Sequence, residues 1–552
     1  MDSRKLLIFL LYCALPIYTI LFVNAFEKVS YDYIIVGAGP GGSAVASRLS
    51  ALYPDEKILV LETGIDVSHN PRTKPSFSFA YASYTSLVKN YFSQEGERLN
   101  YRHLYHMAPS ALGGGSVLNA MCWTWGDPLD WDRWVNDGLT EWAYKDVLPY
   151  FQKVENYTSD DPTGLRGKTG PVTVEKIPPN HYTIEANEAA STVFNLPLAD
   201  DNCVNHQSAS ILQRTMVGKP GTGTRVSAWR AYLGPAAREN PNLLVVPRAT
   251  VLKVLIENGT AIGVEALVKG VYKQFYANQE VIISAGGYNS AKLLLLSGVG
   301  NATELEEVGV DVKYDLPGVG KFLKDHFNPG TISFHGPPFE EYDSNLVAAY
   351  AKTGLSEDEP DLPDFEAGYI VAPSTDDKSM WHYMPSIHLF YVIFMHHDGV
   401  GSVKLASADP LEDPVIVSNF LSSELDLEKA VFVTRKLFEW ASQMPEYDSF
   451  KQVWEEGDIK VRPSATKHEI QEAAKQSVET HWHTSRACKM GVASDPLAVV
   501  DSRFRVFGIS GLRVVDTSVL PHLPTGHPMA TIYVLGERAA DFIVEERSEF
   551  SS

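Results

Sequence analysis

Cysteine is scarce in this chain, with four residues among 552. Cys13 lies in an apolar N-terminal segment that we expect to be removed, which leaves Cys122, Cys203 and Cys488. Three cysteines form at most one disulfide within a chain, so this is not a small disulfide-stapled scaffold. A hydrophobic content of 44% and a charged content of 21% are ordinary for a globular protein. Stability must therefore come from a hydrophobic core, and the length allows two or three packed domains.

Positively charged residues are also few: the chain has 47 Lys and Arg against 68 Asp and Glu, which gives a net charge of −21. Such a surface repels phosphate backbones and anionic lipid headgroups, which argues against nucleic acid or membrane as a partner. The acidic stretch "SEDEPDLPDFE" (Ser356–Glu366) is expected to be a solvated loop.

Long apolar runs are absent after residue 25. Before it, the apolar segment Leu6–Val23 follows Arg4 and Lys5 and ends in "VNA". This pattern predicts a signal peptide, residues 1–25, cut after Ala25; an uncleaved anchor is the alternative. The sequence thus predicts a secreted protein with no membrane contact after cleavage. Three N-x-S/T triplets fit glycosylation on this route, at Asn156, Asn258 and Asn301.

The mature chain opens with a pattern typical of a dinucleotide site. "YDYIIVGAG" (Tyr31–Gly39) predicts a buried parallel strand, "PGGSAVASRLSALYP" a helix and "KILVLETG" (Lys57–Gly64) a second strand, hence a βαβ unit. Gly37, Gly39 and Gly42 have the G-x-G-x-x-G spacing that turns the chain tightly and brings backbone and helix N-terminus to a pyrophosphate. Glu62, at the end of the second strand, is placed to accept the ribose hydroxyls.

The rest of the chain predicts a nucleotide-binding domain interrupted by a second domain. Buried strands return within residues 243–267, 279–287 and 511–521, whereas the alternating aromatic segment 382–407 is typical of antiparallel sheet. We predict an α/β fold: a discontinuous Rossmann-like domain (residues 29–154, 222–330 and 485–545) and an inserted α+β substrate-binding domain on an antiparallel sheet (residues 155–221 and 331–484).

Several long segments resemble one enzyme family. "LGGGSVLNAMCWTWGDPLDWDRW" (Leu112–Trp134), "SAGGYNSAKLLLLSGVG" (Ser284–Gly300), "DLPGVGKFLKDH" (Asp315–His326) and the C-terminal block from Val499 resemble, in order, the motifs of the glucose–methanol–choline (GMC) flavin oxidoreductases. The resemblance implies bound FAD. It implies cofactor contacts from Gly114, Ser116, Asn119, Val251, Asp516, Thr517 and Pro528. Relatives with covalent FAD carry a histidine where this chain has Leu118, so we expect non-covalent FAD.

The stretch "THWHTSRACKMG" (Thr480–Gly491) contains His481 and His483 and admits three interpretations: a metal site, a catalytic base, or core histidines. A metal site needs a third ligand that no spacing indicates, so no metal is expected. Similarity to the family places His483 at the catalytic position and His527 as its partner. His481 is expected to be structural, as are His396, His397 and His522.

The family's chemistry suggests the reaction and its alternatives. We expect His483 to take the hydroxyl proton while a hydride moves to flavin N5, with His527 holding the substrate oxygen and O2 as final acceptor, giving H2O2. A small aromatic or apolar alcohol, including an aromatic cyanohydrin such as mandelonitrile, is the expected substrate, against a pocket wall of Trp123, Tyr391, Phe394 and Trp482. The alternatives are a non-redox hydroxynitrile lyase and a dehydrogenase with another acceptor. Arg486 replaces a small residue of the family motif and either meets an anionic substrate or turns to a carboxylate elsewhere.

Overall fold

We analysed a computed structural model of the chain, which describes residues 29–70, 73, 85–202, 206–218, 223–338, 345–356, 361–373, 385–455 and 457–551. The predicted signal peptide, residues 1–25, and Cys203 lie outside these ranges. Within them, Cys122 and Cys488 are buried free thiols. Among the described helices, none combines the length and the apolar character needed to cross a bilayer.

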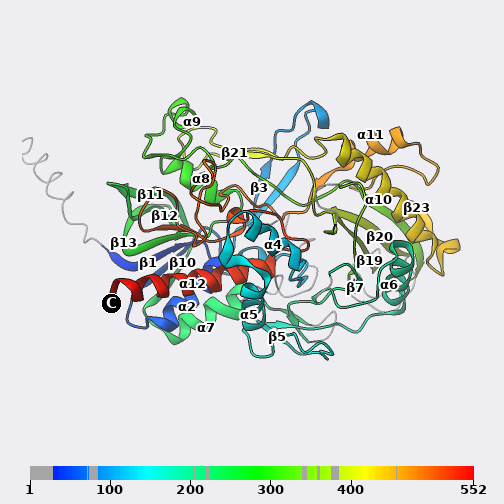
Figure 1. Ribbon diagram of the computed structural model, residues 1–552, viewed down its shortest axis with the longest axis horizontal. Helices are drawn as coiled ribbons and strands as arrows, with labels where there is room; N and C mark the ends of the chain where they lie inside the picture. The colour runs from blue at the N-terminus through cyan, green and yellow to red at the C-terminus, as the bar shows by residue number, and fades with distance from the viewer. Residues whose placement is uncertain are drawn as a thin grey trace, which may run out of the picture.

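One half of the molecule, formed by segments from both ends of the chain, is built on a seven-stranded sheet (Figure 1). Its parallel part has the order β10-β2-β1-β13, with β25 also beside β13, and its antiparallel part adds β12 and β11. The parallel strands are continuous apolar runs because both faces are covered; Ile34 and Ile35 of β1 are fully buried. The bounds are β1 (Ser30–Val36), β2 (Ile58–Glu62), β10 (Leu243–Pro247), β11 (Ala249–Glu257), β12 (Thr260–Val268), β13 (Val271–Ile283) and β25 (Leu512–Val514).

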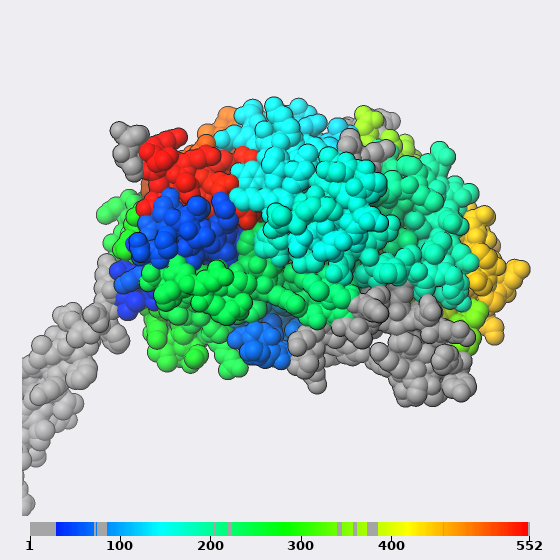
Figure 2. All heavy atoms as spheres, turned by 90° about the horizontal axis from the view of Figure 1, so that it is seen from below, coloured from blue at the N-terminus to red at the C-terminus, as the bar shows by residue number. Residues whose placement is uncertain are grey.

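Two helices from opposite ends of the chain pack together against this sheet. Helix α2 (Pro40–Leu52) lies beside α12 (Met529–Ser551), and Arg48 forms an ion pair of 2.7 Å with Asp541. A Cβ on Gly536 would lie 2.7 Å from the Ala44 side chain, so the two helices approach at a glycine. In Figure 2 the red C-terminal segment accordingly adjoins the blue N-terminal one. The predicted βαβ unit is confirmed.

The second half contains an antiparallel sheet of order β23-β17-β20-β19-β18-β7, with β16 and β24 at its border (Figure 1). The long helix α10 (Glu424–Ser442) packs on it through Trp440, which contacts Tyr369 and Phe390. The bounds are β7 (Ala209–Ile211), β16 (Phe327–Asn328), β17 (Ile332–Pro338), β18 (Val347–Ala351), β19 (Phe365–Pro373), β20 (Pro385–Phe394), β23 (Lys451–Val453) and β24 (Glu479–Thr480).

Shorter elements connect the two halves. The helices are α4 (Pro128–Asn136), α5 (Tyr144–Val154), α6 (His181–Phe194), α7 (Gly234–Glu239), α8 (Asn289–Leu296), α9 (Ala302–Glu307) and α11 (Lys467–Ser477). The strands are β3 (Val88–Phe92), β4 (Tyr105–Pro109), β5 (Glu155–Tyr157), β6 (Val172–Val174), β8 (Met216–Val217), β9 (Thr224–Arg225), β14 (Val299–Gly300), β15 (Tyr314–Asp315), β21 (Ser402–Lys404) and β22 (Val415–Val417).

The strands of the two sheets come from different segments of the chain. All strands of the first sheet fall within the three segments expected for the nucleotide-binding domain. The second sheet falls within the two remaining segments, apart from β16, which precedes the expected boundary at residue 331.

The expected solvated loop Ser356–Glu366 is wrong at its C-terminal end. Asp364, Phe365 and Glu366 are buried, the last two as the start of β19. Pairing with β18 and β20 draws this end of the acidic stretch into the sheet, an effect that local composition does not reveal.

Candidate active site

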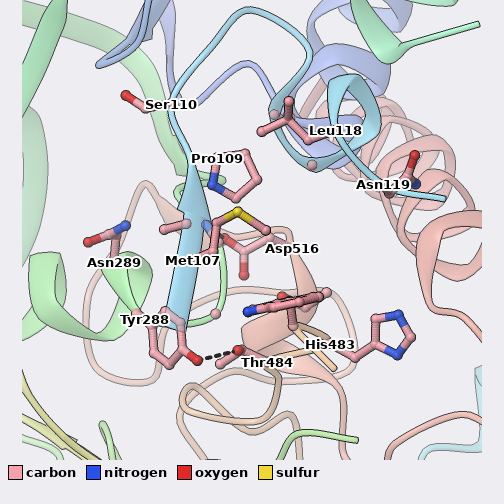
Figure 3. A pocket seen from close by; sticks show the side chains of 18 of the residues that line it. Met107, Pro109, Ser110, Leu118, Asn119, Tyr288, Asn289, His483, Thr484 and Asp516 are labelled. Atoms are coloured by element: carbon pink, nitrogen blue, oxygen red, sulfur yellow. Dashed lines mark hydrogen bonds between the residues drawn. The ribbon is translucent and has the colours of Figure 1, made fainter. Parts of the chain in front are cut away.

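A cavity of about 760 Å³ lies between the two sheets. Val36, Leu61 and Val251 line it from the first sheet, and Ile370, Leu389 and Tyr391 line it from the second. Figure 3 shows His483 and Thr484 beside Tyr288, whose hydroxyl accepts a 2.6 Å hydrogen bond from Thr484, with Pro109 and Leu118 farther along the wall. The cavity thus joins the predicted nucleotide site to the histidines.

The glycines of the first turn create one end of this cavity. Gly37 has a φ of +106°, and a Cβ there would lie 2.2 Å from the Ser284 carbonyl oxygen. A Cβ on Gly42 would lie 2.2 Å from the Gly37 carbonyl, so this third glycine permits close helix packing and does not line the cavity. Gly39 and Gly114 lie so close that a Cβ on Gly114 would be 2.6 Å from the Gly39 Cα. Backbone therefore forms this wall.

Glu62 lies where the sequence predicts it, at the end of β2 and on the cavity wall. Its Oε2 accepts a 2.9 Å hydrogen bond from the Ala38 amide, and its Oε1 accepts a 2.8 Å bond from the Gly64 amide. Burial raises the pKa of Glu62 to about 7, against the effect of these donors. The two amides hold the carboxylate in one orientation at the cavity.

The predicted flavin-lining segment is held by a residue that sequence reasoning missed. Asn119 accepts a 2.7 Å hydrogen bond at Oδ1 from the buried Arg225, and its Nδ2 lies 3.0 Å from the Met529 sulfur. Ser116 donates to the Gly113 carbonyl at 2.5 Å and accepts from the Ala228 amide at 2.8 Å. Both side chains line the cavity in fixed orientations.

The remaining expected cofactor residues also reach the cavity: Val251, Asp516, Thr517 and Pro528. The carboxylate of Asp516 accepts four hydrogen bonds from within the protein. The donors are the Gly286 amide at 2.8 Å, the Ser290 hydroxyl at 2.5 Å, and the Ser518 amide and hydroxyl at 2.8 and 2.6 Å. It therefore ties the loop before α8 to the segment after β25.

These features fit FAD. Helix α2 has Gly39 as its N-cap with no side-chain capping bond, and Gly39, Pro40 and Gly41 line the cavity. Its first amides and dipole are thus available to a pyrophosphate. Glu62 stands one strand away for a ribose, and the cavity continues past Asn119 to His483. Leu118, which also lines the cavity, has no nucleophilic atom for a flavin bond.

At the far end three histidines converge: His481, His483 and His527. The ring centroids of His483 and His527 are 5.0 Å apart, and those of His481 lie 5.0 Å and 5.8 Å from them. All three line the cavity. His481, which we expected to be structural, also lines the cavity, because β24 ends at Thr480 and the next three residues turn into it.

His326, which the sequence did not indicate, contacts the ring of His483 and fixes its orientation. Its Nδ1 lies 2.9 Å from the Nδ1 of His483, so one ring donates and the other accepts. The Pro524 carbonyl, acting on the same ring, raises the pKa of His326 as a hydrogen-bond acceptor does, although burial keeps that pKa well below its usual value. Because Nδ1 of His326 faces His483, we assign the proton of the His326 ring to Nε2. His483 then donates from Nδ1 and keeps a lone pair on Nε2 for the cavity.

Asp325 holds the backbone of the same segment. Its Oδ1 accepts a 2.7 Å hydrogen bond from the His483 amide, and its Oδ2 accepts from the Thr480 and Thr484 hydroxyls. Burial raises the pKa of Asp325 to about 7. Asp325 and His326 both belong to the block "DLPGVGKFLKDH", whose family resemblance was the available signal.

Glu366 is the buried partner of His527. Its Oε2 lies 3.3 Å from His527 Nε2, at the start of β19. Burial alone would raise the pKa of Glu366, but His527, His481 and the Tyr350 hydroxyl together outweigh it, and the pKa lies below its ordinary value. An ionised carboxylate therefore orients His527 and leaves its Nδ1 for the cavity.

Burial favours the neutral form of two imidazoles of this cluster, His483 and His481. It lowers the pKa of His483 well below its ordinary value, and His527, His481 and His326 add to this effect. Burial and His527 lower the pKa of His481 to about 3. A neutral His483 is in the state required of a proton acceptor at neutral pH.

The predicted substrate wall is half right. Tyr391 and Trp482 line the cavity, and Trp482 is 40% exposed. Trp123 and Phe394 do not reach it: Trp123 packs on Tyr533 at 6.1 Å, and Phe394 packs on Phe327 at 5.0 Å. Both are fully buried core residues, the usual fate of aromatic side chains in sheets.

Arg486 does not meet the cavity of the histidines. Its guanidinium lies 5.6 Å from the Phe322 ring, and Asp137 and Asp495 attract it. Burial, with Arg133, lowers the pKa of Arg486 to about 10. The attraction of Asp137 and Asp495 favours the second of the two expectations for this residue, a turn toward carboxylates elsewhere.

Known proteins match the chain over nearly its whole length. Residues 31–328 and 398–536 match the N- and C-terminal models of the GMC oxidoreductases. An oxygen-dependent choline dehydrogenase of Sinorhizobium fredii is 33% identical over 546 residues, covering 93% of this chain and 95% of the relative. Pyridoxine 4-oxidase from "Mesorbium loti" has a TM-score of 0.81 at 24% identity, covering 93% of this chain and 99% of that one. A fungal aryl-alcohol oxidase has a TM-score of 0.77 at 20% identity, covering 95% and 100%. The chain therefore belongs to the GMC oxidoreductases, FAD-dependent enzymes that act on CH–OH donors.

Proposed function

We propose that this protein is an alcohol oxidase that converts a small aromatic or apolar alcohol, including an aromatic cyanohydrin such as mandelonitrile, to the carbonyl compound. The observation that carries the proposal is the pair His483 and His527 at an apolar end of the FAD-type cavity, with their ring centroids 5.0 Å apart. FAD, when bound, supplies the acceptor for the hydride of the carbinol carbon.

His483 acts as the general base. Its Nε2 lone pair takes the hydroxyl proton, and its Nδ1–H remains donated to His326. This arrangement holds Nε2 toward the substrate both before and after it takes the proton. A positioned base of this kind accelerates proton transfer by about 10²–10⁴-fold.

His527 orients the substrate oxygen. Glu366 fixes one side of the ring at 3.3 Å, and the other nitrogen is directed to the substrate. Its amide donates to Thr124 Oγ1 at 2.8 Å, which fixes the backbone as well. A group held in place beside the oxygen keeps the hydroxyl in position for proton transfer to His483.

The wall around the histidines supports an apolar substrate. Leu346, Ile370, Leu389 and Tyr391 line this part of the cavity with Trp482. Glu366 is fully buried and already paired with His527, so its carboxylate does not offer a counter-charge to a cationic alcohol.

Choline is the second candidate, for a specific reason. Relatives named oxygen-dependent choline dehydrogenases share 33% identity with this chain, and Tyr391 and Trp482 present aromatic rings to the cavity. Aromatic faces hold quaternary ammonium groups by cation–π attraction. The two candidates are separated by direct comparison of substrates.

The test uses the purified flavoprotein without oxygen, mixed separately with benzyl alcohol, mandelonitrile and choline. Bleaching of the oxidised flavin by the aromatic alcohols, followed by recovery and H2O2 on admission of air, is the expected result. Slow recovery in air with fast recovery by an artificial acceptor would make the protein a dehydrogenase. Release of cyanide and benzaldehyde from mandelonitrile while the flavin stays yellow would make it a lyase.

We further propose that FAD is bound non-covalently, that the chain is secreted after cleavage of residues 1–25, and that it is glycosylated. Leu118 supports non-covalent binding, because its side chain has no nucleophilic atom for a flavin bond. Denaturation should therefore release the flavin. Asn258 lies at an exposed turn, whereas Asn156 and Asn301 are half-buried, the latter capping α9 through a 3.1 Å bond to the Glu304 amide. Mass spectrometry of the secreted protein tests the cleavage and the sites.

A further inference from the structure

The three-histidine cluster has the composition of a metal site as well as that of a base. One ligand nitrogen from each of His481, His483 and His527 lies within 4.8 Å of the others. The third ligand that the sequence spacing of "HWH" did not indicate comes from a segment more than 40 residues away, brought in by the fold. Among the described residues this is the single group of its kind.

The distances allow closure around one ion. Zinc binds histidine nitrogens at about 2.0–2.1 Å, so tetrahedral ligands stand about 3.4 Å apart. Starting from 4.8 Å or less, the ligand nitrogens need to approach by at most about 1.4 Å to close around a zinc ion. His481 and His483 are half-buried, His527 is buried, and all three line the cavity, so an ion has access from it.

The partners behind the cluster strengthen the case. Metal-binding histidines generally direct their second nitrogen to a carboxylate or another acceptor, which fixes the ring and its tautomer. Glu366 stands 3.3 Å from His527 Nε2, and His326 stands 2.9 Å from His483 Nδ1. With those contacts assigned, the nitrogens that remain to bind an ion are Nδ1 of His527 and Nε2 of His483.

We propose that His481, His483 and His527 form a binding site for a borderline divalent cation, Zn²⁺ or Cu²⁺, with its fourth position open to the cavity. Imidazole ligands suit these ions better than Mg²⁺ or Ca²⁺, which prefer oxygen. The ion occupies the lone pair that His483 uses as a base and the place of the alcohol oxygen. Resting on the proposed function, the metal is therefore a reversible inhibitor that competes with the alcohol.

The test begins with the flavin-loaded protein, freed of metal by a chelator and without substrate. Calorimetric titration with Zn²⁺ should show one ion per chain. With Cu²⁺, the electron paramagnetic resonance spectrum should show coupling to three nitrogens. Because neither measurement needs turnover, failure of the alcohol oxidase proposal leaves this result interpretable.

Matched variants locate the ion. His481→Phe keeps an aromatic ring but removes one ligand, and it should weaken Zn²⁺ binding by about 100-fold or more, since loss of an outer partner alone costs 10–100-fold. His468→Phe, on the exposed face of α11, should leave binding unchanged. Retained flavin absorbance verifies folding of each variant. No binding by the wild type, a nitrogen coupling that is unaltered in His481→Phe, or equal affinity in both variants would overturn the site.

Inhibition is measured last. Zn²⁺ should raise the KM for the alcohol without changing kcat, and a chelator should restore it. Binding without competition would refute the inhibitory role while leaving the site in place.

Discussion

His326 offers the sharpest test of how the site works. Its Nδ1 is the partner of His483 Nδ1 at 2.9 Å, and it is fully buried. Replacing it by leucine removes the acceptor, so the His483 ring loses the contact that selects its tautomer and angle. A lost buried hydrogen bond costs about 1–3 kcal/mol. At about 1.36 kcal/mol per factor of ten, the rate of substrate oxidation should fall roughly 5- to 150-fold.

The matched variant is His326→Asn. Asparagine Oδ1 occupies nearly the position of histidine Nδ1 and accepts the same hydrogen bond, so most of the activity should return. The assay is the rate of flavin reduction by alcohol in an anaerobic stopped-flow instrument, followed over pH. Flavin content and circular dichroism verify that both variants are folded. Equal rates for leucine and asparagine, or a wild-type rate for leucine, would refute the assignment of His326 as a positioning residue.

Three further predictions concern the cofactor end and the substrate wall. Gly114→Ala should lose most of its flavin, because a Cβ at φ +54° meets the Gly39 Cα at 2.6 Å, whereas Gly115→Ala, whose Cβ meets only Pro109 at 3.9 Å, should keep it; the ratio of flavin to protein absorbance decides. Glu62 has a pKa of about 7 in the folded protein against 4.5 for a free side chain, so between these values the folded flavin-free protein holds a proton that the unfolded chain has lost. As the pH rises from 4.5 to 7, the free energy of unfolding should therefore fall by about 3 kcal/mol. Urea unfolding across that range should show a pH dependence smaller by this amount in Glu62→Gln, and an equal slope in both proteins would contradict the burial argument. Trp482→Ala should raise the KM for an aromatic alcohol more than that for a small aliphatic one; an equal effect on both would remove Trp482 from the substrate wall.

Local sequence was sufficient wherever the chemistry depends on neighbours along the chain. Gly37, Gly39 and Gly42 lie on one turn between a strand and a helix, and Glu62 ends the next strand, so spacing alone placed them. Long motifs resembling the GMC family supplied His483 and His527 in the same way. These residues reach the cavity as expected, except Gly42, whose place in the helix contact was also expected.

Errors arose where burial and long-range pairing decide. Trp123 and Phe394 are aromatic residues in the right segments, but the side of the backbone on which each packs turns them into the core. Glu366 reads as part of an acidic loop, yet strand pairing on both sides carries it to His527.

The sequence by itself determined the α/β class, the dinucleotide turn and the identity of the two principal histidines, because each rests on residues within a short stretch or on a family motif. Only the tertiary structure decided that His481 joins them, that His326 and Glu366 stand behind them, and that Arg486 points elsewhere. Each of these contacts joins segments far apart in the chain or depends on how a segment turns in the fold. Their closeness is set by the packing of the two sheets and the connections between them, which no local pattern encodes.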